Sequence, residues 1–494
     1  MTPSRPLDRA LLLGLGILAL SAIAGSTAPG PLPPGTVEDW FLIRIGGSAV
    51  GTASERWITG DRETDFAAQM NLSFTRMGTP LSMTILTEEA CDPAGKFLRS
   101  RMQSTVSNLT SSAVLDGDSL RYETSAGGST RHVVMPWKPG AVSEKVGRQL
   151  VAHWLSGAAP ETTITVFDIS DGDFRASRLV RGKRLTTPIG QTERDVIPVD
   201  EFDADATTAS STTWYAATGK HEAERTLVRQ LGVEIEIVHV SNAELENTTI
   251  EPSFDIIKQS MVPCPGFPTP ASRMDAVTLV LDFPGTPPPQ SMNGPSQREV
   301  SRNGGAVTLE LTRAMADKQT VPDDQRDTFL KPDRFVQSDA PQIKAVADSI
   351  RTATRADSWV LARSIASWVG EYITHKNMEQ GYASALDVYR TRTGDCTEHS
   401  LLTTAVLRAA GIPARPVVGL AYSEHDHAFV GHMWVEAYVD QWRTLDALNL
   451  NLDPIRIRVY APESSEGMGE RDLMRAYAMM AGVKVRAVEH RPRS

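Results

Sequence analysis

A cysteine at a loop-to-helix junction is the residue of this sequence best suited to covalent chemistry. Residues 392–400 read RTGDCTEHS, so Gly394 and Asp395 directly precede Cys396. Aspartate often caps a helix, which predicts Cys396 in the first helical turn. There the unpaired N–H groups and the helix dipole favour a thiolate and can bind an oxyanion. Gly394 is expected to leave room for a substrate backbone, although a lone cysteine at such a position is more often a small buried side chain.

A histidine and an aspartate further along the chain could complete a triad. His432 begins an alternating run and shares one strand face with Trp434, while Asp446 lies on a second predicted strand. Asp446 and His432 lie on the same face of the sheet only if residues directly opposite each other on the two strands have numbers that add up to an even number. A two-residue turn at 440–441 would direct Asp446 to the wrong side. A three-residue loop or a bulge would place it opposite Trp434 and diagonal to His432, within reach of its side chain.

Other histidines near these residues have alternative interpretations. His399 lies three positions after Cys396 and could act as the base, but a structural role is favoured because His432 has a carboxylate partner at a suitable spacing. Residues 425–427, His-Asp-His, could bind a metal together with His432. They lack a regular ligand spacing, so no metal site is predicted, and no cofactor is indicated.

Helices followed by an antiparallel sheet are predicted to position the three residues. Apolar residues recur at helical spacing after Asp339 and Pro341, and again after Asp357. A third helix is predicted from Cys396 to Ala410, because Gly411 and then Pro413 form a typical helix exit. Strands are predicted at 414–422, 432–439 and 442–448.

Four blocks in this region resemble the bacterial transglutaminase-like core. They are GDCxEH from Gly394, LRAAGIPAR at 407–415, HxWxE from His432, and the segment from Trp442 to Asp446, all within about 331–460. The resemblance implies a papain-like fold with Cys396 as nucleophile, His432 as base and Asp446 as the residue that orients the imidazole. Ala447 departs from the pattern, since many relatives have proline there.

The N-terminal half is dominated by period-two patterns typical of strands. A hairpin is predicted at Gly46-Gly47 and a helix near 143–155. So long an antiparallel meander must bury one face, either by curving into a half-barrel or by packing on a helix. It resembles the curved-sheet domains of periplasmic lipid-carrier and lipoprotein-handling proteins, and no cluster in it indicates chemistry. The fold class expected is therefore α+β, a transglutaminase-like core preceded by a large antiparallel β domain.

The N-terminus has the pattern of an export signal. Arg5 and Arg9 precede an apolar run at 10–24 that ends in Ala22-Ile23-Ala24, which suits cleavage before Gly25. The alternative is an uncleaved anchor that associates with the membrane through 10–24. Either reading predicts a periplasmic or extracellular protein. The organisation expected is a signal or anchor at 1–24, a linker at 25–39, the β-rich domain at 40–260, a proline-rich linker at 261–272, a small β segment at 273–330 and the catalytic domain at 331–494.

Composition narrows the possible partners. The 494 residues carry a net charge of −10, which argues against nucleic-acid binding. The chain has three cysteines. Cys91 and Cys264 are expected in exposed loops, where they either pair or remain two thiols; a bond would leave Cys396 as the free one.

The function expected is thiol-dependent acyl transfer on an amide, with a peptide or protein as substrate. With water as acceptor the protein would be a cysteine peptidase or amidase, and analogy slightly favours this reaction. With an amine as acceptor it would be a crosslinking transglutaminase. The remaining alternative is a non-catalytic binding or scaffold protein whose β domain holds a lipid, a glycan or a protein partner.

Overall fold

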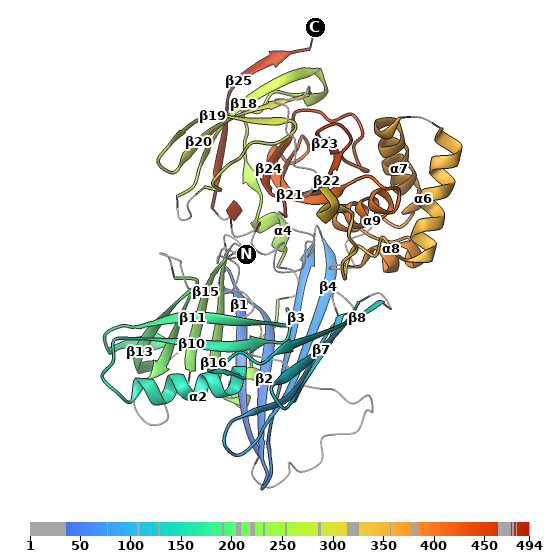
Figure 1. Ribbon diagram of the computed structural model, residues 1–494. Coiled ribbons are helices and arrows are strands. Elements are labelled where there is room, and N and C mark those ends of the chain that lie inside the picture. Colours follow the sequence, from blue (N-terminus) through green and yellow to red (C-terminus); the bar gives the residue numbers. More distant parts are fainter. Residues whose placement is uncertain are drawn as a thin grey trace. The chain divides into compact units, whose positions relative to one another are not determined.

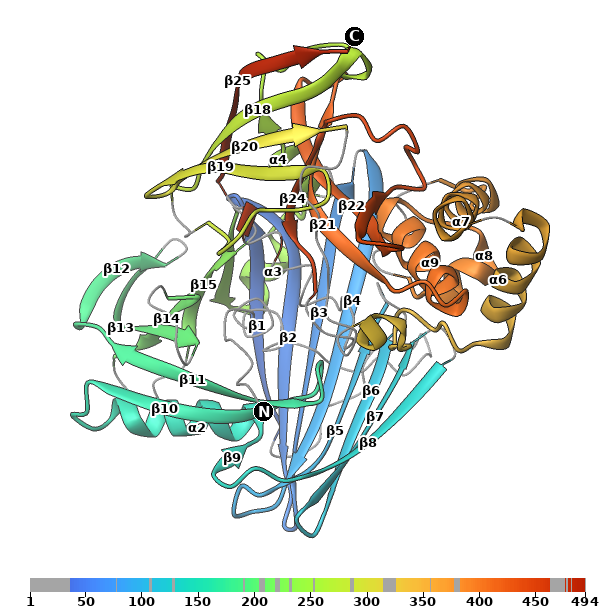
Figure 2. The same ribbon diagram turned by 45° about the horizontal axis from the view of Figure 1, so that its top comes forward.

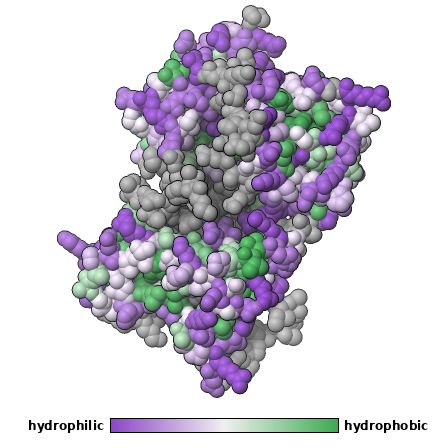
Figure 3. All heavy atoms as spheres, viewed as in Figure 1, coloured by the Kyte–Doolittle hydropathy of each residue, from purple (hydrophilic) through white to green (hydrophobic). Residues whose placement is uncertain are grey.

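The chain forms two compact units in the computed structural model (Figure 1). The first comprises residues 1–75, 80–125 and 130–254, and the second comprises 76–79, 126–129 and 255–494. The structure describes residues 36–76, 78–105, 109–126, 129–189, 192–203, 209–217, 223–230, 233–251, 254–284, 288–313, 326–355, 357–376, 383–462, 476, 479–480 and 482–493. On the face seen in Figure 3 the coloured surface is mainly polar, with small apolar areas.

A 16-stranded sheet makes up most of the N-terminal unit. Its order is β8-β7-β6-β5-β4-β3-β2-β1-β16-β15-β14-β13-β11-β10-β9, with β12 paired to β13, so it ends in β8 and β9 and does not close. The large antiparallel β domain that the sequence predicts is confirmed. The strands are β1 (Thr36–Ile45), β2 (Ser48–Thr59), β3 (Thr64–Arg76), β4 (Thr79–Cys91), β5 (Phe97–Ser104), β6 (Leu109–Asp116), β7 (Ser119–Ala126), β8 (Ser129–Pro136), β9 (Ala141–Val142), β10 (Glu161–Asp168), β11 (Asp173–Arg181), β12 (Leu185–Ile189), β13 (Thr192–Asp203), β14 (Ser211–Ala216), β15 (Ala223–Gln230) and β16 (Val233–Val240).

The predicted hairpin and helix of this unit are both present. Gly46 and Gly47 turn β1 into β2 at φ angles of 56° and 87°, which side chains other than glycine rarely adopt. Helix α2 (Glu144–Leu155) begins at Ser143, whose hydroxyl accepts a hydrogen bond from the Val146 amide. Figure 2 shows α2 running along β10 and β11. A short helix, α3 (Asn242–Glu246), follows the last strand.

The C-terminal unit contains two sheets. One has the order β17-β22-β21-β24 with β23 paired to β22, and the other has the order β19-β20-β18-β25. The predicted small β segment is therefore completed by β25, from the C-terminal end of the described chain. The elements are α4 (Ile256–Gln259), β17 (Val262–Pro263), η1 (Ala271–Arg273), β18 (Met274–Asp282), β19 (Gln297–Asn303), β20 (Ala306–Thr312), η2 (Asp327–Leu330), β21 (Ala414–Ser423), β22 (Ala428–Tyr438), β23 (Trp442–Leu445), β24 (Arg456–Tyr460) and β25 (Lys484–Pro492).

Four helices pack together beside β21 and β22 (Figure 1). They are α6 (Pro341–Thr354), α7 (Ser358–Tyr372), α8 (Ala385–Thr391) and α9 (Cys396–Ala409). The helix predicted after Asp357 is present as α7, and the Asp357 side chain caps it. Helix α6 begins after Ala340 without a side-chain cap, so Asp339 does not cap it. Helix α9 is buried along almost its whole length, because the other helices and β22 surround it.

The proline-rich segment 261–272 is not the exposed spacer that its composition indicates. Val262 and Pro263 form β17 and pair with Phe429 and Ala428 of β22. The Cys264 amide donates a hydrogen bond to the His427 carbonyl, and Phe267 stacks on Tyr422. Proline is compatible with an edge strand, so this stretch adds a strand to the sheet instead of separating domains.

The expected exposure of Cys91 and Cys264 is wrong, and of the two alternatives that the sequence leaves open the structure has two free thiols. The two residues are 3% and 1% exposed, and both thiols are free. Cys91 ends β4 with its sulfur 3.2 Å from the Ser143 hydroxyl at the start of α2. Tertiary packing therefore buries both cysteines, although the local sequence around each is typical of a loop.

The predicted signal or anchor at 1–24 lies outside the described residues, as does most of the linker at 25–39. Among the helices that the structure describes, none combines the length and the apolar character needed to cross a membrane.

Candidate active site

Local sequence fixes the loop that carries Cys396. The Asp395 side chain accepts a hydrogen bond from the Thr397 amide at 2.8 Å and caps α9. Glu398 completes a capping box, because its carboxylate accepts from the Asp395 amide at 2.9 Å. Cys396 therefore occupies the first position of α9, as the sequence predicts.

Gly394 is required for a reason different from the expected one. A β-carbon at this position would lie 2.2 Å from Cβ of Glu398, and the residue has a φ of 155°. The space that a side chain at position 394 would occupy is thus filled by Glu398. Glu398 is fully buried and also accepts a hydrogen bond from the Ala383 amide, so it ties the nucleophile loop to the start of α8.

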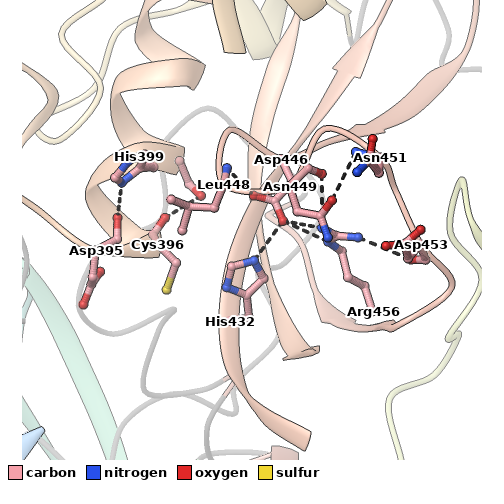
Figure 4. Close-up of polar contacts among 11 residues, drawn as sticks. Asp395, Cys396, His399, His432, Asp446, Leu448, Asn449, Asn451, Asp453 and Arg456 are labelled. Carbon is pink, nitrogen blue, oxygen red and sulfur yellow. Dashed lines mark hydrogen bonds and ion pairs between the residues drawn. The ribbon is translucent and has the colours of Figure 1, made fainter. Parts of the chain in front are cut away.

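The register of β22 and β23 brings His432 and Asp446 together. Three residues, 439–441, connect the strands, and Tyr438 pairs with Trp442 while Glu436 pairs with Thr444. This is the even-sum register that the triad hypothesis requires. The His432 Nε2 and the Asp446 Oδ2 are 2.9 Å apart (Figure 4).

The remaining ring nitrogen of His432 faces the Cys396 thiol, which lies beside the imidazole in Figure 4. Burial alone lowers the pKa of His432, but the Asp446 charge and hydrogen bond and the Cys396 thiol raise it to about 10. Burial raises the pKa of Asp446, yet His432 and Arg456 together hold it below its usual value. The arrangement therefore favours an imidazolium between a carboxylate and a sulfur.

Arg456 is a contact of Asp446 that sequence reasoning missed. Its Nε and Nη2 donate to the same Asp446 oxygen that binds His432, at 2.9 and 2.7 Å. The second Asp446 oxygen accepts from the Leu448 amide at 2.9 Å. The only sequence signal for Arg456 is the alternation of 456–460, RIRVY, which is typical of a strand.

A second buried carboxylate, Glu436, anchors the histidine strand. It accepts from Arg415 Nε at 2.9 Å and from Arg458 Nε at 2.8 Å. Burial raises its pKa, but Arg458 and Arg415 outweigh that effect and lower it. Glu436 thus stays charged and links β22 to β21 and β24.

His399 has the environment of a structural residue. Its Nδ1 lies 2.6 Å from the Asp395 carbonyl, which can only accept, so Nδ1 carries the proton. Burial lowers the pKa of His399, which keeps the ring neutral. Its Nε2 is buried and has no hydrogen-bond partner among the described residues, so it is not hydrogen-bonded to Cys396.

The start of α9 also offers a donor for an oxyanion. The Thr397 and Glu398 amides both donate to the Asp395 side chain. No acceptor for the Cys396 amide lies among the described residues. This amide is available to a carbonyl oxygen of a bound substrate.

The described residues contain no group of three or more histidine, cysteine, aspartate or glutamate side chains that could hold a metal ion. The run 425–427 has other contacts: the Asp426 carboxylate accepts from the Ser423 hydroxyl at 2.6 Å.

Cys396, His432 and Asp446 all lie in a region of the chain that matches a known protein family. Residues 344–447 match the family model described as the transglutaminase-like superfamily, which confirms the resemblance inferred from the sequence blocks. The comparison with curated proteins found no match.

Three solved structures match parts of the chain at low similarity. A proposed cysteine protease from Cytophaga hutchinsonii is 19% identical, with 44% of this chain and 84% of that chain covered and a TM-score of 0.27. A β-barrel-like protein of a domain of unknown function from Brucella abortus is 12% identical, with 41% and 95% covered and a TM-score of 0.32. The periplasmic domain of TgpA from Pseudomonas aeruginosa is 16% identical, with 38% and 86% covered and a TM-score of 0.27. At these values the likeness carries no argument about function.

Proposed function

Because residues 344–447 form a transglutaminase-like core, we propose that this protein is a thiol-dependent acyl-transfer enzyme acting on amide bonds. The observation that carries the proposal is the position of His432, which faces the Cys396 thiol and is bound by Asp446 at 2.9 Å. A nucleophile, a base and an orienting carboxylate in this order are the parts that covalent amide chemistry needs.

The first half-reaction follows from these positions. The Cys396 sulfur, its proton transferred to His432, attacks the carbonyl carbon of the amide and forms a C–S bond. The carbonyl oxygen becomes an oxyanion that the Cys396 amide can bind. His432 then returns the proton to the amide nitrogen, the C–N bond breaks, the amine leaves, and a thioester remains on Cys396.

The second half-reaction depends on the acceptor. His432 takes a proton from water or from an amine, the acceptor attacks the thioester carbon, and the C–S bond breaks to regenerate the thiol. We favour water, so that the enzyme is a peptidase or amidase on peptide or protein substrates. Crosslinking by an amine is the alternative, since both acceptors use the same acyl-enzyme.

Product analysis on peptide libraries, with and without an added primary amine, tests the proposal. Cleaved peptides that require Cys396 would support hydrolysis, and peptide–amine adducts would support transamidation. The matched control is Cys264→Ala, which removes a buried thiol outside the triad. Absence of both products, together with no thioester on Cys396 in mass spectra, would refute acyl transfer.

Selective labelling of the native protein gives an independent test of the nucleophile. Burial raises the pKa of Cys91 to about 12 and also raises the pKa of Cys264, so both thiols resist alkylation. Iodoacetamide should therefore modify Cys396 first, and His432→Ala should slow that labelling. Equal labelling of all three cysteines in the folded protein would contradict this assignment.

We also propose that the enzyme acts outside the cytoplasm. Arg5, Arg9 and the apolar run at 10–24 have the pattern of an export signal. N-terminal sequencing of the protein from its native host should find Gly25 first. An intact Met1 in the membrane fraction would show an uncleaved anchor instead.

A further inference from the structure

His399 is a buried histidine of α9 that lies close to the nucleophile and outside the triad. It is 2% exposed, and several of the α9 residues that follow it, Leu401, Leu402 and Ala405 among them, are buried and apolar. Its Nε2 is buried and has no hydrogen-bond partner within the described part of the chain. A buried acceptor without a partner is costly, so packing alone does not explain an imidazole at this position.

The other ring nitrogen binds the peptide group that joins Asp395 to Cys396. Nδ1 of His399 donates to the Asp395 carbonyl at 2.6 Å (Figure 4). The same carbonyl accepts from the His399 amide at 3.1 Å, as the capping residue of a helix normally does. That bond and the capping box already hold the start of α9. The imidazole bond is therefore an addition that the helix does not need in order to begin.

This peptide group also carries the amide that can bind an oxyanion. The Asp395 carbonyl and the Cys396 N–H belong to one planar trans peptide, so they point in opposite directions. A bond that fixes the carbonyl therefore fixes the direction of the N–H. A hydrogen bond accepted by the carbonyl also polarises the peptide and strengthens its N–H as a donor. Through this one peptide, His399 can act on the oxyanion without touching the substrate.

We propose that His399 is a positioning residue for the oxyanion: its Nδ1–H orients and polarises the Asp395–Cys396 peptide, whose N–H binds the carbonyl oxygen of the substrate. The ring acts as a neutral donor, since the Asp395 carbonyl can only accept. His432 remains the base. This role rests on the proposed acyl transfer at Cys396. It requires His399 to stabilise the transition state of acylation and not to activate the thiol.

Two reactions of Cys396 separate this role from a purely structural one. Acetylation by p-nitrophenyl acetate passes through an oxyanion, whereas methyl methanethiosulfonate transfers a methylthio group to the thiolate and forms none. His399→Leu should slow acetylation of Cys396 by roughly 10- to 100-fold, because the donor is misdirected and not removed. Methylthiolation should change by less than about threefold, because the thiol and His432 are unaltered. Mass spectrometry of the full chain measures both products at Cys396.

Variants that differ in the position of one donor refine the test. His399→Asn places an amide nitrogen near the position of Nδ1 and should recover most of the acetylation rate, whereas His399→Gln places it near Nε2 and should not. Thr403 lies one turn further along the same face of α9, and its buried hydroxyl has no partner among the described residues. Thr403→Val is the matched control and should change neither rate. If His399→Leu fails to fold, the comparison of His399→Asn with His399→Gln decides.

The possible failures are distinguishable. Equal slowing of both reactions in His399→Leu would show a purely structural role and overturn the proposal. So would unchanged acetylation in that variant, or equal acetylation rates in His399→Asn and His399→Gln. Wild-type protein that is methylthiolated but not acetylated at Cys396 would refute the proposed acyl transfer itself, and the positioning role with it.

Discussion

Arg456 should set the pH range in which the proposed triad works. Arg456 and His432 donate to the same Asp446 oxygen, at 2.7–2.9 Å and 2.9 Å, so their charges are less than about 6 Å apart. Two like charges at that distance repel by roughly 3 kcal/mol at an effective dielectric constant of 20. The His432 side chain is 16% exposed, so solvent screens this repulsion. We expect Arg456 to destabilise the imidazolium by about 1–2 kcal/mol.

The perturbation is Arg456→Gln, which removes the charge and keeps a polar side chain. The pKa of His432 is about 10 with Arg456 present. Loss of the repelling charge should raise that pKa, and the alkaline limb of kcat/KM should move to higher pH by about one pH unit, since 1.36 kcal/mol corresponds to one unit. The rate itself should fall by roughly 10- to 100-fold, because Asp446 loses two of the donors that fix its position.

Two control variants distinguish tuning of the triad from simple loss of a buried charge. Arg458→Gln also removes an arginine of β24, which is partly buried, but Arg458 binds Glu436 and not Asp446. It should lower the melting temperature and leave the pH profile unchanged. Arg456→Lys should keep the alkaline limb near its original position. If Arg456→Gln lowers the rate without moving that limb, or if Arg458→Gln moves it equally, the reasoning is wrong.

Three further outcomes are expected. Cys396→Ser should abolish turnover with the circular dichroism spectrum unchanged, because an alcohol is a much weaker nucleophile; full activity of Cys396→Ala would contradict the mechanism. Asp446→Asn should keep a residual rate in the peptide assay, because the imidazole is misoriented but still present; complete loss equal to that of Cys396→Ser would argue against a purely orienting role. Glu398→Ala should lower the free energy of unfolding by about 1–3 kcal/mol in a denaturant titration, because two buried amides lose their acceptor, whereas Glu398→Gln should retain most of it.

Local rules predict much of the site from sequence. Neighbouring residues determine the cap at Asp395 and the start of α9 at Cys396. The length of one loop determines the strand register that brings His432 and Asp446 together. The same is true of the Gly46-Gly47 hairpin and of α2. These features follow from helix capping, strand alternation and turn length, which act over a few residues.

The features that sequence reasoning missed depend on contacts between distant segments. Arg456 reaches Asp446 because β24 pairs with β21, and Cys264 is buried because its segment adds a strand to β22. No local pattern encodes either pairing. The expected exposure of Cys91 and Cys264 is wrong for the same reason, since burial of each residue comes from partners far along the chain.

Two buried carboxyl groups of the C-terminal unit hold different parts of the proposed triad. Glu398 secures the nucleophile loop through two amides, and Glu436 secures the histidine strand through two arginines. The two arginines of Glu436 outweigh the cost of burying its charge, whereas burial and the neighbouring Asp395 raise the pKa of Glu398 above its usual value. Asp446 alone is shared between the imidazole and a structural cation. The strength of its bond to His432 therefore depends on Arg456, so a change at this arginine should alter the proposed base without moving Cys396.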